Sequence, residues 1–294
     1  MHPGNHTHTY KSVGECEIRA DIYRGPGDGP RPVIVWVHGG ALIMGHRGSI
    51  PEWQRDLYLE AGYTVVSIDY RLAPETKLPQ IIEDLRDAWH WVREDGPSLF
   101  QADPRRIAVI GHSAGGYLAL MSGSSVETRP RALVSFYGYG DIVGAWYSEP
   151  DPYYCQQPMV PEEEARSVVG RRPLSEASQQ PGRERFYLYC RQQGRWPSEV
   201  AGRDPGSEPD FFREFCPLQN ITADYPPTLL LHGDRDTDVP NQQSAMMADA
   251  LSRAGVQHDL ITIPGGDHGF DEERGPVAAD ALARVLGFLN ARLS

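Results

Sequence analysis

Short apolar runs rich in β-branched residues alternate with amphipathic stretches along most of the chain. The continuous apolar runs predict strands that are covered on both faces, because a strand with one solvated face would alternate with polar residues. These runs are residues 32–37, 63–68, 106–110, 132–137, 227–231 and 259–263. The run at 16–24 precedes the alternation and predicts an antiparallel edge strand.

Apolar residues at three- and four-residue spacing predict helices between these strands. One helical face is formed by Leu78, Ile81, Ile82, Leu85, Trp89 and Val92, and another by Leu282, Val285, Leu286, Leu289 and Leu293. Strands that alternate with helices predict an α/β fold, with a mostly parallel central sheet, right-handed crossovers and flanking helices.

Residues 141–225 interrupt this alternation, since no clear strand can be assigned there. The segment is polar and rich in Pro and Gly, yet it carries many aromatic residues, which a disordered linker would lack. Stretches 183–191 and 210–215 are expected to be helical. We therefore predict a helical cap at 141–225, inserted into a core formed by residues 1–140 and 226–294.

Composition and charge exclude several classes of partner. The chain has 294 residues, with 40 acidic against 28 basic side chains and a formal net charge of −12. This charge repels nucleic acid and anionic membrane surfaces, so neither is expected as a partner. The N-terminus lacks the apolar segment of a secretory signal, and no run approaches the roughly 18 to 20 apolar residues that span a bilayer. These features favour a cytoplasmic protein.

Cysteine and histidine placement predicts no metal centre. Cys16, Cys155, Cys190 and Cys216 are widely spaced without a C-x-x-C pair, and we expect free thiols. His2, His6 and His8 crowd the N-terminus, where we expect mobile, solvated side chains without a function.

A candidate nucleophile lies in the sequence Gly-His-Ser-Ala-Gly at residues 111–115. It follows the predicted strand 106–110 and opens a helical run through Leu118 and Leu120, which is the strand–turn–helix context of a nucleophile elbow. A side chain at Gly111 or Gly115 would collide with its neighbours in so tight a turn. The turn holds Ser113 clear of the sheet, at a helix N-terminus that favours negative charge.

Backbone amides near this serine are candidates for an oxyanion hole. His-Gly-Gly-Ala at residues 38–41 follows the strand 32–37, and its small residues allow close approach of the backbone to a substrate. The candidate donors are the amides of Gly40, Ala41 and Ala114. Fixed donors of this kind stabilise the charge that develops on the carbonyl oxygen during acyl transfer.

His268 is the candidate base among the chain's ten histidines. It lies in a glycine-rich loop directly after the strand 259–263, and the pKa of histidine suits both removal and return of a proton. The loop after the strand 227–231 offers Asp234, Asp236 and Asp238 as candidate acids. The resulting chain order of Ser, Asp and His is that of α/β-hydrolases.

These motifs together resemble the hormone-sensitive-lipase-like carboxylesterases and the related acetyl- and feruloyl-type esterases. The resemblance rests on His-Gly-Gly, Gly-His-Ser-Ala-Gly-Gly, His-Gly-Asp-Arg-Asp-Thr-Asp-Val-Pro, Asp-His-Gly-Phe and the stretch 69–75, over residues 30–140 and 226–294. It implies the α/β-hydrolase fold, hydrolysis of small carboxylic esters without a cofactor, and Asp236 as the acid. It also implies that stretch 70–75 is structural.

The chain departs from the family pattern in two places. Ala41 stands where the family usually has a third glycine, and the insertion at 141–225 replaces the long N-terminal extension that builds the cap of many members. Trp146, Tyr187 and Trp196 of the insertion are candidates to line a substrate pocket. The residues do not determine the substrate or whether the chain forms a homo-oligomer.

Two other functions remain open. An amidase or peptidase could use the same triad, although oligopeptidases of this fold usually carry a large additional domain. A catalytically silent small-molecule binding protein would be expected to lack a triad member, and all are present here. Haloalkane or epoxide chemistry would require an aspartate at position 113, and dienelactone-type hydrolysis a cysteine.

Overall fold

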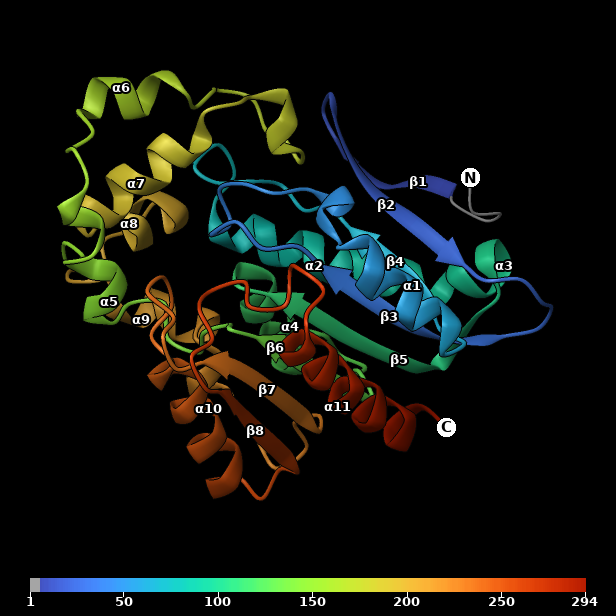
Figure 1. The fold of residues 1–294 in the computed structure, drawn as a ribbon. Coiled ribbons are helices and arrows are strands. Elements are labelled where there is room, and N and C mark those ends of the chain that lie inside the picture. The colour runs from blue at the N-terminus through green and yellow to red at the C-terminus, as the bar shows by residue number, and fades with distance from the viewer. Residues whose placement is uncertain (1–5) are drawn as a thin grey trace.

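The computed structural model describes residues 6–294, and its centre is one eight-stranded sheet in the order β1-β2-β4-β3-β5-β6-β7-β8 (Figure 1). The strands are β1 (His6–Val13), β2 (Cys16–Arg24), β3 (Arg31–Val37), β4 (Thr64–Ile68), β5 (Ala102–His112), β6 (Ala132–Phe136), β7 (Thr228–Gly233) and β8 (His258–Ile263). β2 is antiparallel to β1 and β4, and all pairs from β4 to β8 are parallel. The predicted α/β-hydrolase fold is confirmed.

Helices cover both faces of this sheet. They are α1 (Glu52–Glu60), α2 (Leu78–Glu94), α3 (Gly96–Phe100), α4 (Ala114–Ser125), α10 (Gln242–Arg253) and α11 (Pro276–Leu293). One apolar core joins the sheet to α2, α4 and α10, and a second joins it to α1 and α11. The apolar spacing therefore predicted α2 and α11 with their buried faces correctly.

Residues 141–225 contain helices and irregular chain but no strand. The helices are α5 (Ala145–Ser148), α6 (Glu162–Ser167), α7 (Arg183–Gln193), α8 (Trp196–Ala201) and α9 (Pro209–Phe212). Single 3₁₀ turns complete the chain at η1 (Arg47–Ser49), η2 (Tyr154–Gln156), η3 (Ala177–Gln179), η4 (Arg213–Phe215) and η5 (Pro217–Gln219). Figure 1 shows α5 to α8 gathered at the end of the sheet toward which the parallel strands point.

The N-terminal strand β1 was not predicted from the sequence. We expected His6 and His8 to be mobile, but both belong to β1, and the His8 ring lies 5.9 Å from that of Trp91. Tyr10 donates to the carbonyl of Asp69 at 2.6 Å, and Lys11 Nζ lies 2.8 Å from Asp84, so this edge strand is fixed to the core. His2 lies outside the described residues.

The remaining bulk expectations concern cysteines and membranes. All four cysteines are free in the structure. Among residues 6–294, no helix combines the length and the apolar character needed to cross a bilayer.

Candidate active site

Ser113 occupies a strained turn between β5 and α4. Its backbone has φ 55° and ψ −119°, a conformation that L-residues rarely adopt and that is held here by the packing around it. A Cβ on Gly111 would collide with the carbonyl of Gly115, and a Cβ on Gly115 would collide with the carbonyl of Val37. The turn therefore requires glycine at both positions, as its sequence predicted.

The loop after β3 presents its backbone toward the same place. Gly40 and Ala41 have φ values of 102° and 55°, and both line a cavity together with Ser113. Within the described chain, the amides of Gly40, Ala41 and Ala114 donate to no protein group. These amides are therefore available to an oxygen atom of a ligand. Trp196 fixes the loop from behind, because its Nε1–H donates to the Ala41 carbonyl at 2.9 Å.

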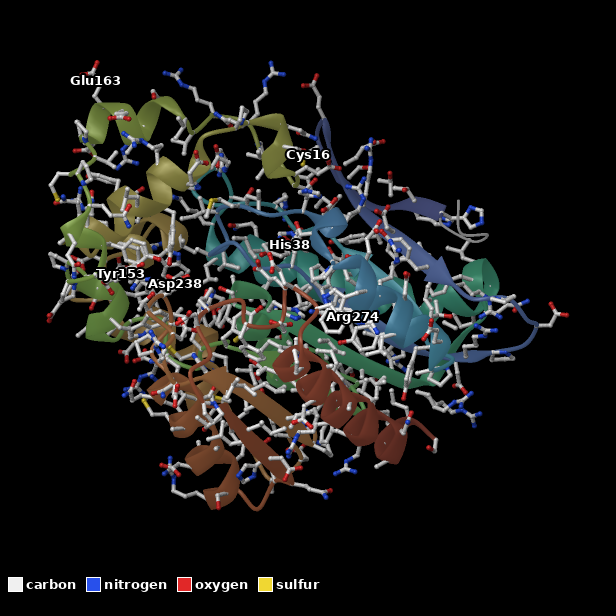
Figure 2. All side chains as sticks on the ribbon, viewed as in Figure 1. Cys16, His38, Tyr153, Glu163, Asp238 and Arg274 are labelled. Atoms are coloured by element: carbon white, nitrogen blue, oxygen red, sulfur yellow. The ribbon has the colours of Figure 1, made fainter. Side chains whose placement is uncertain are left out.

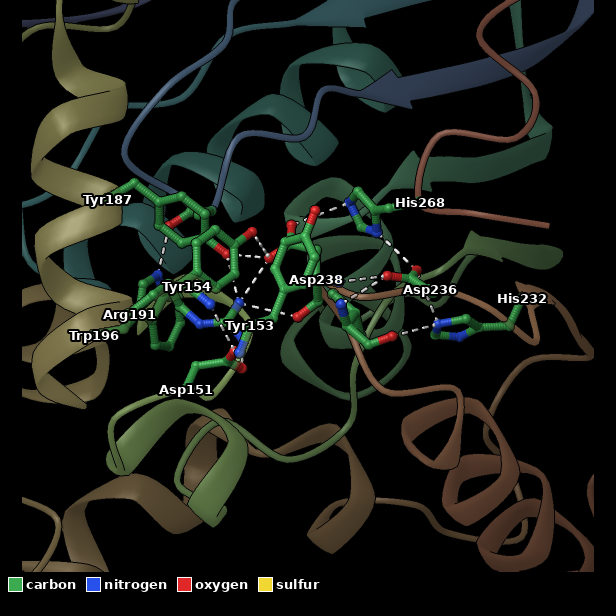
Figure 3. Close-up of polar contacts among 12 residues, drawn as sticks. Asp151, Tyr153, Tyr154, Tyr187, Arg191, Trp196, His232, Asp236, Asp238 and His268 are labelled. Atoms are coloured by element: carbon green, nitrogen blue, oxygen red, sulfur yellow. Dashed lines mark hydrogen bonds and ion pairs between the residues drawn. The ribbon is translucent and has the colours of Figure 1, made fainter. Parts of the chain in front are cut away.

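Asp236 contacts His268 directly. His268 Nδ1 lies 2.7 Å from Asp236 Oδ2, while Asp236 Oδ1 accepts the amides of Asp238 and Val239 at 2.9 Å each (Figure 3). His232 Nε2 lies 3.3 Å from the same carboxylate. Burial raises the pKa of Asp236, but the hydrogen bonds from His232 and His268 outweigh burial and hold this pKa well below its ordinary value.

For the other two aspartates of this loop the sequence predicts local capping roles, Asp234 in the turn after Gly233 and Asp238 at the helix that begins near Asn241, but the structure gives both of them other partners. We would place Asp234 as a cap of its own turn, but it accepts the amide of Gly265 at 2.6 Å and so joins the loop of His268. Asp238 does not cap the helix that begins near Asn241. Instead, it accepts hydrogen bonds from Tyr154 and Arg191 at 2.8 and 2.7 Å, and one from Tyr187.

One cavity of about 600 Å³ contains both Ser113 and His268. Within residues 6–294 no hydrogen bond joins Ser113 Oγ to the His268 ring, whose Nε2 lies 3.4 Å from Asp238 Oδ2. Hydrogen bonds of catalytic groups are often longer without a substrate and tighten when one binds. The carboxylates of Asp238 and Glu272 line the cavity, and no Lys or Arg of the described part of the chain does.

The aromatic residues of the insertion divide into two groups. Tyr187 lines the cavity. Trp196 is fully buried and stacks on Tyr147 at 4.1 Å, and Trp146 stacks on the same ring at 3.7 Å, so neither indole reaches the cavity. This differs from the expectation that the two tryptophans line a substrate pocket: Trp196 is buried against the loop of Ala41, and Trp146 is a partly buried side chain that packs on Tyr147.

A buried polar network beside Ser113 was not foreseen. The Asp271 carboxylate lies 2.8 Å from His112 Nε2, and it accepts hydrogen bonds from Tyr137 and Gln54, each also at 2.8 Å. Burial raises the pKa of Asp271, but the charge and hydrogen bond of His112 and the bonds from Tyr137 and Gln54 lower it overall. The network connects the nucleophile turn to the loop of His268. Each of its residues has an ordinary type for its position, so no sequence signal marks it.

The stretch 70–75 connects the strands to the loop after β3. Tyr70 stacks on His38 with the ring centroids 4.2 Å apart, and its hydroxyl donates to the His38 carbonyl at 3.1 Å. Glu75 pairs with Arg183 of α7 at 2.8 Å. Burial lowers the pKa of His38 to about 3, so this histidine is neutral and takes a structural role.

The described residues contain no group of three or more His, Cys, Asp or Glu that could hold a metal ion. The arrangement is suited to acyl-transfer chemistry, because a serine at a helix N-terminus, a histidine bound to a carboxylate, and backbone amides without a protein acceptor meet at one cavity. The fold and this site define an esterase of the α/β-hydrolase class.

Comparison with known families agrees with this class. The BD-FAE family model matches residues 20–251, most of the chain, and the protein therefore belongs to the BD-FAE family. The Dienelactone hydrolase family also matches, over residues 216–293 only. That match leaves out position 113, where this chain has a serine.

Curated relatives include an esterase and larger synthases. Esterase LipC of Mycobacterium tuberculosis is 30% identical, over 89% of this chain and 58% of its own length. The non-reducing polyketide synthase ausA of Aspergillus calidoustus is 31% identical, over 82% of this chain and 12% of its own length. The chain thus spans about half of LipC and a small part of the synthase.

Solved structures share the fold. A Staphylococcus aureus protein of unknown function superposes with a TM-score of 0.80 at 23% identity, over 98% of this chain and 99% of its own. Thermogutta terrifontis esterase 2, phosphoramylated by tabun, gives a TM-score of 0.69 at 22% identity, over 99% and 96% of the two chains.

Proposed function

We propose that this esterase is a serine carboxylesterase that hydrolyses small carboxylic esters through an acyl-enzyme intermediate. The observation that carries the proposal is the single cavity that holds Ser113, the Asp236-bound His268 and the amides of Gly40 and Ala41. An aspartate on Nδ1 fixes the tautomer in which Nε2 is free to accept a proton.

In the first half-reaction His268 Nε2 accepts the Ser113 hydroxyl proton as Oγ bonds to the ester carbonyl carbon. The carbonyl oxygen becomes an oxyanion, which the amides of Gly40, Ala41 and Ala114 stabilise. The C–O bond to the alcohol then breaks, and His268 returns the proton to the departing oxygen. In the second half-reaction a water molecule takes the place of the alcohol, and the carboxylic acid and free Ser113 are regenerated.

The insertion at 141–225 acts in this proposal as a cap that closes one side of the cavity. Tyr187 brings its ring to the cavity wall, and Trp196 holds the loop that carries the Ala41 amide. The cap thereby limits the volume available to the ester, which favours small acyl and alcohol groups.

The experiment that tests the proposal compares the purified protein with its Ser113→Ala variant on p-nitrophenyl esters from acetate to decanoate and on a matched anilide. We expect turnover of the short esters to fall by on the order of 10³-fold or more in the variant. Equal activity of the two proteins would overturn the serine mechanism. A preference for the anilide would replace the esterase with an amidase on the same residues.

A further inference from the structure

Asp238 is a second carboxylate on the imidazole of His268. Asp236 lies 2.7 Å from Nδ1, and Asp238 Oδ2 lies 3.4 Å from Nε2 on the opposite edge of the ring (Figure 3). Asp238 also lines the cavity that contains Ser113. Its side chain therefore faces the nitrogen that exchanges protons in the proposed function.

The inserted segment holds Asp238 in this orientation. Tyr154 and Arg191 donate to Oδ1 at 2.8 and 2.7 Å, and Tyr187 donates to the same oxygen. Arg191 also donates to the backbone carbonyl of Asp238 at 2.9 Å. Every one of these bonds uses Oδ1 or the backbone, which leaves Oδ2 directed to His268. Figure 2 shows Asp238 between the helices of the insertion and the core.

We propose that Asp238 is a positioning residue, held by the inserted segment, that stabilises the protonated form of His268 and thereby sets the lowest pH at which the esterase works. The proposal rests on the proposed function, because it assumes that His268 is the base. It gives the insertion a role in the chemistry that is separate from closing the cavity.

The charged groups around His268 together determine whether its pKa is raised or lowered. Burial lowers the pKa of His268, but the hydrogen bond to Asp236, the charges of Asp238 and Asp236, and then that of Glu272, together raise it above its ordinary value. Tyr137, the residue directly after β6, packs on the ring without carrying a charge at neutral pH. On the far side of Asp238, Arg191 offsets part of the negative charge and is itself paired with Asp151.

His268 must be neutral to accept the serine proton, so activity falls as the pH drops through the pKa of His268. A carboxylate that raises this pKa moves the acid limb of the pH–rate profile upward. It also stabilises the imidazolium that forms in the transition state. Removing the charge of Asp238 should therefore extend activity to lower pH and reduce the maximum rate.

The test is the pH dependence of kcat/KM for p-nitrophenyl acetate in the full chain and its Asp238→Asn variant. A unit charge at this distance is worth about one pH unit at the dielectric constant of water and more in a partly hydrated cavity, so we expect the acid limb to move down by about one pH unit or more. The plateau should fall by up to about tenfold. The amide is isosteric and retains an oxygen that accepts from Tyr154, Tyr187 and Arg191; circular dichroism checks that the variant folds.

Two further variants separate this role from a structural one. Asp267→Asn removes an exposed carboxylate next to His268 in sequence and should leave the acid limb in place. Arg191→Gln removes the positive charge that offsets Asp238, while Tyr154 and Tyr187 still hold its Oδ1, so the acid limb should move up, opposite to Asp238→Asn. A loosened fold cannot produce shifts of opposite sign.

An unmoved acid limb in active Asp238→Asn protein would overturn the proposal, as would a downward shift in Arg191→Gln. Those results would leave the proposed function intact, provided that Ser113→Ala remains inactive. Activity in Ser113→Ala would overturn the proposed function itself, so the two failures can be distinguished.

Discussion

Asp236 is the residue at which the loop between β7 and α10 contacts His268, the proposed base. Its two carboxylate oxygens have different partners: Oδ2 contacts His268, and Oδ1 accepts hydrogen bonds from two backbone amides of its own loop. The loop thus fixes the carboxylate before any substrate binds. Asp234 lies two residues away, and its carboxylate is already occupied by the Gly265 amide.

We expect Asp236→Asn to lower kcat by on the order of 10⁴, because an amide at this position favours the wrong histidine tautomer. Asp234→Asn serves as the matched control and should cost roughly tenfold or less, since it weakens only a loop contact of ~1 kcal/mol. Steady-state kinetics of both variants, each checked for folding, provide the measurement. If Asp234→Asn loses activity while Asp236→Asn retains it, the acid is misassigned.

At the scale of single residues, the sequence predicted the candidate serine, histidine and aspartate but not the side chains that surround them. Motif order predicted that an aspartate of the loop after β7 would meet His268, because the carboxyl ends of parallel strands meet at one edge of the sheet, and the family resemblance selected Asp236 among the three. The contacts of Asp238 with Tyr154, Tyr187 and Arg191 could not be predicted. These three partners lie in the insertion, where the spacing of apolar residues does not show how the chain runs. The contact between Asp271 and His112 could not be predicted either, because the two residues are far apart in sequence and no motif links them.

At the scale of elements, α7 is joined to the core by a buried ion pair. Arg183 and Glu75 have side chains that are 1% and 0% exposed, and Arg183 also donates to the carbonyls of Ile43 and Ala73. The insertion is thereby attached to the loop that carries Gly40 and Ala41. The apolar runs predicted the central strands well, while β1 was missed because its His and Thr residues lack an apolar run.

The variant Glu75→Gln leaves Arg183 buried without its counter-charge, and we expect it to lower the free energy of unfolding by about 3–5 kcal/mol. The exposed pair between Arg172 and Glu15 supplies the control, because Glu15→Gln removes a solvated partner and should leave stability unchanged. Urea denaturation measures both. If the insertion acts as a cap, Glu75→Gln should also change the ratio of turnover on the acetate ester to turnover on the decanoate ester. This account of α7 would be contradicted if the two variants had the same stability and the same ratio of turnover.

At the scale of the whole molecule, the net charge of the chain has the same sign as the two carboxylates that line the cavity. The chain has a net charge of −12, and among residues 6–294 the cavity is lined by the carboxylates of Asp238 and Glu272 and by two histidines, without a Lys or Arg. The electrostatic field of the whole protein and the two carboxylates in the cavity therefore both repel negative charge. Both oppose an anionic substrate.

We expect kcat/KM for an ester with a terminal carboxylate, such as a p-nitrophenyl hemisuccinate, to lie about tenfold or more below that of a neutral ester of similar length. Added salt should narrow the difference, because it screens the long-range part of the repulsion. The assay compares both esters between low and high ionic strength. Equal rates at low salt would contradict this electrostatic account.

The nucleophilic role of Ser113 is tested most directly by mass spectrometry of the protein after reaction with a fluorophosphonate. We expect one adduct on the peptide that contains Ser113, formed in parallel with loss of esterase activity, because Ser113 shares one cavity with the Asp236-bound His268 and with the amides of Gly40 and Ala41. Prior occupation of the cavity by a short ester should slow labelling. An adduct on another residue, or an active protein that gains no adduct, would contradict the account.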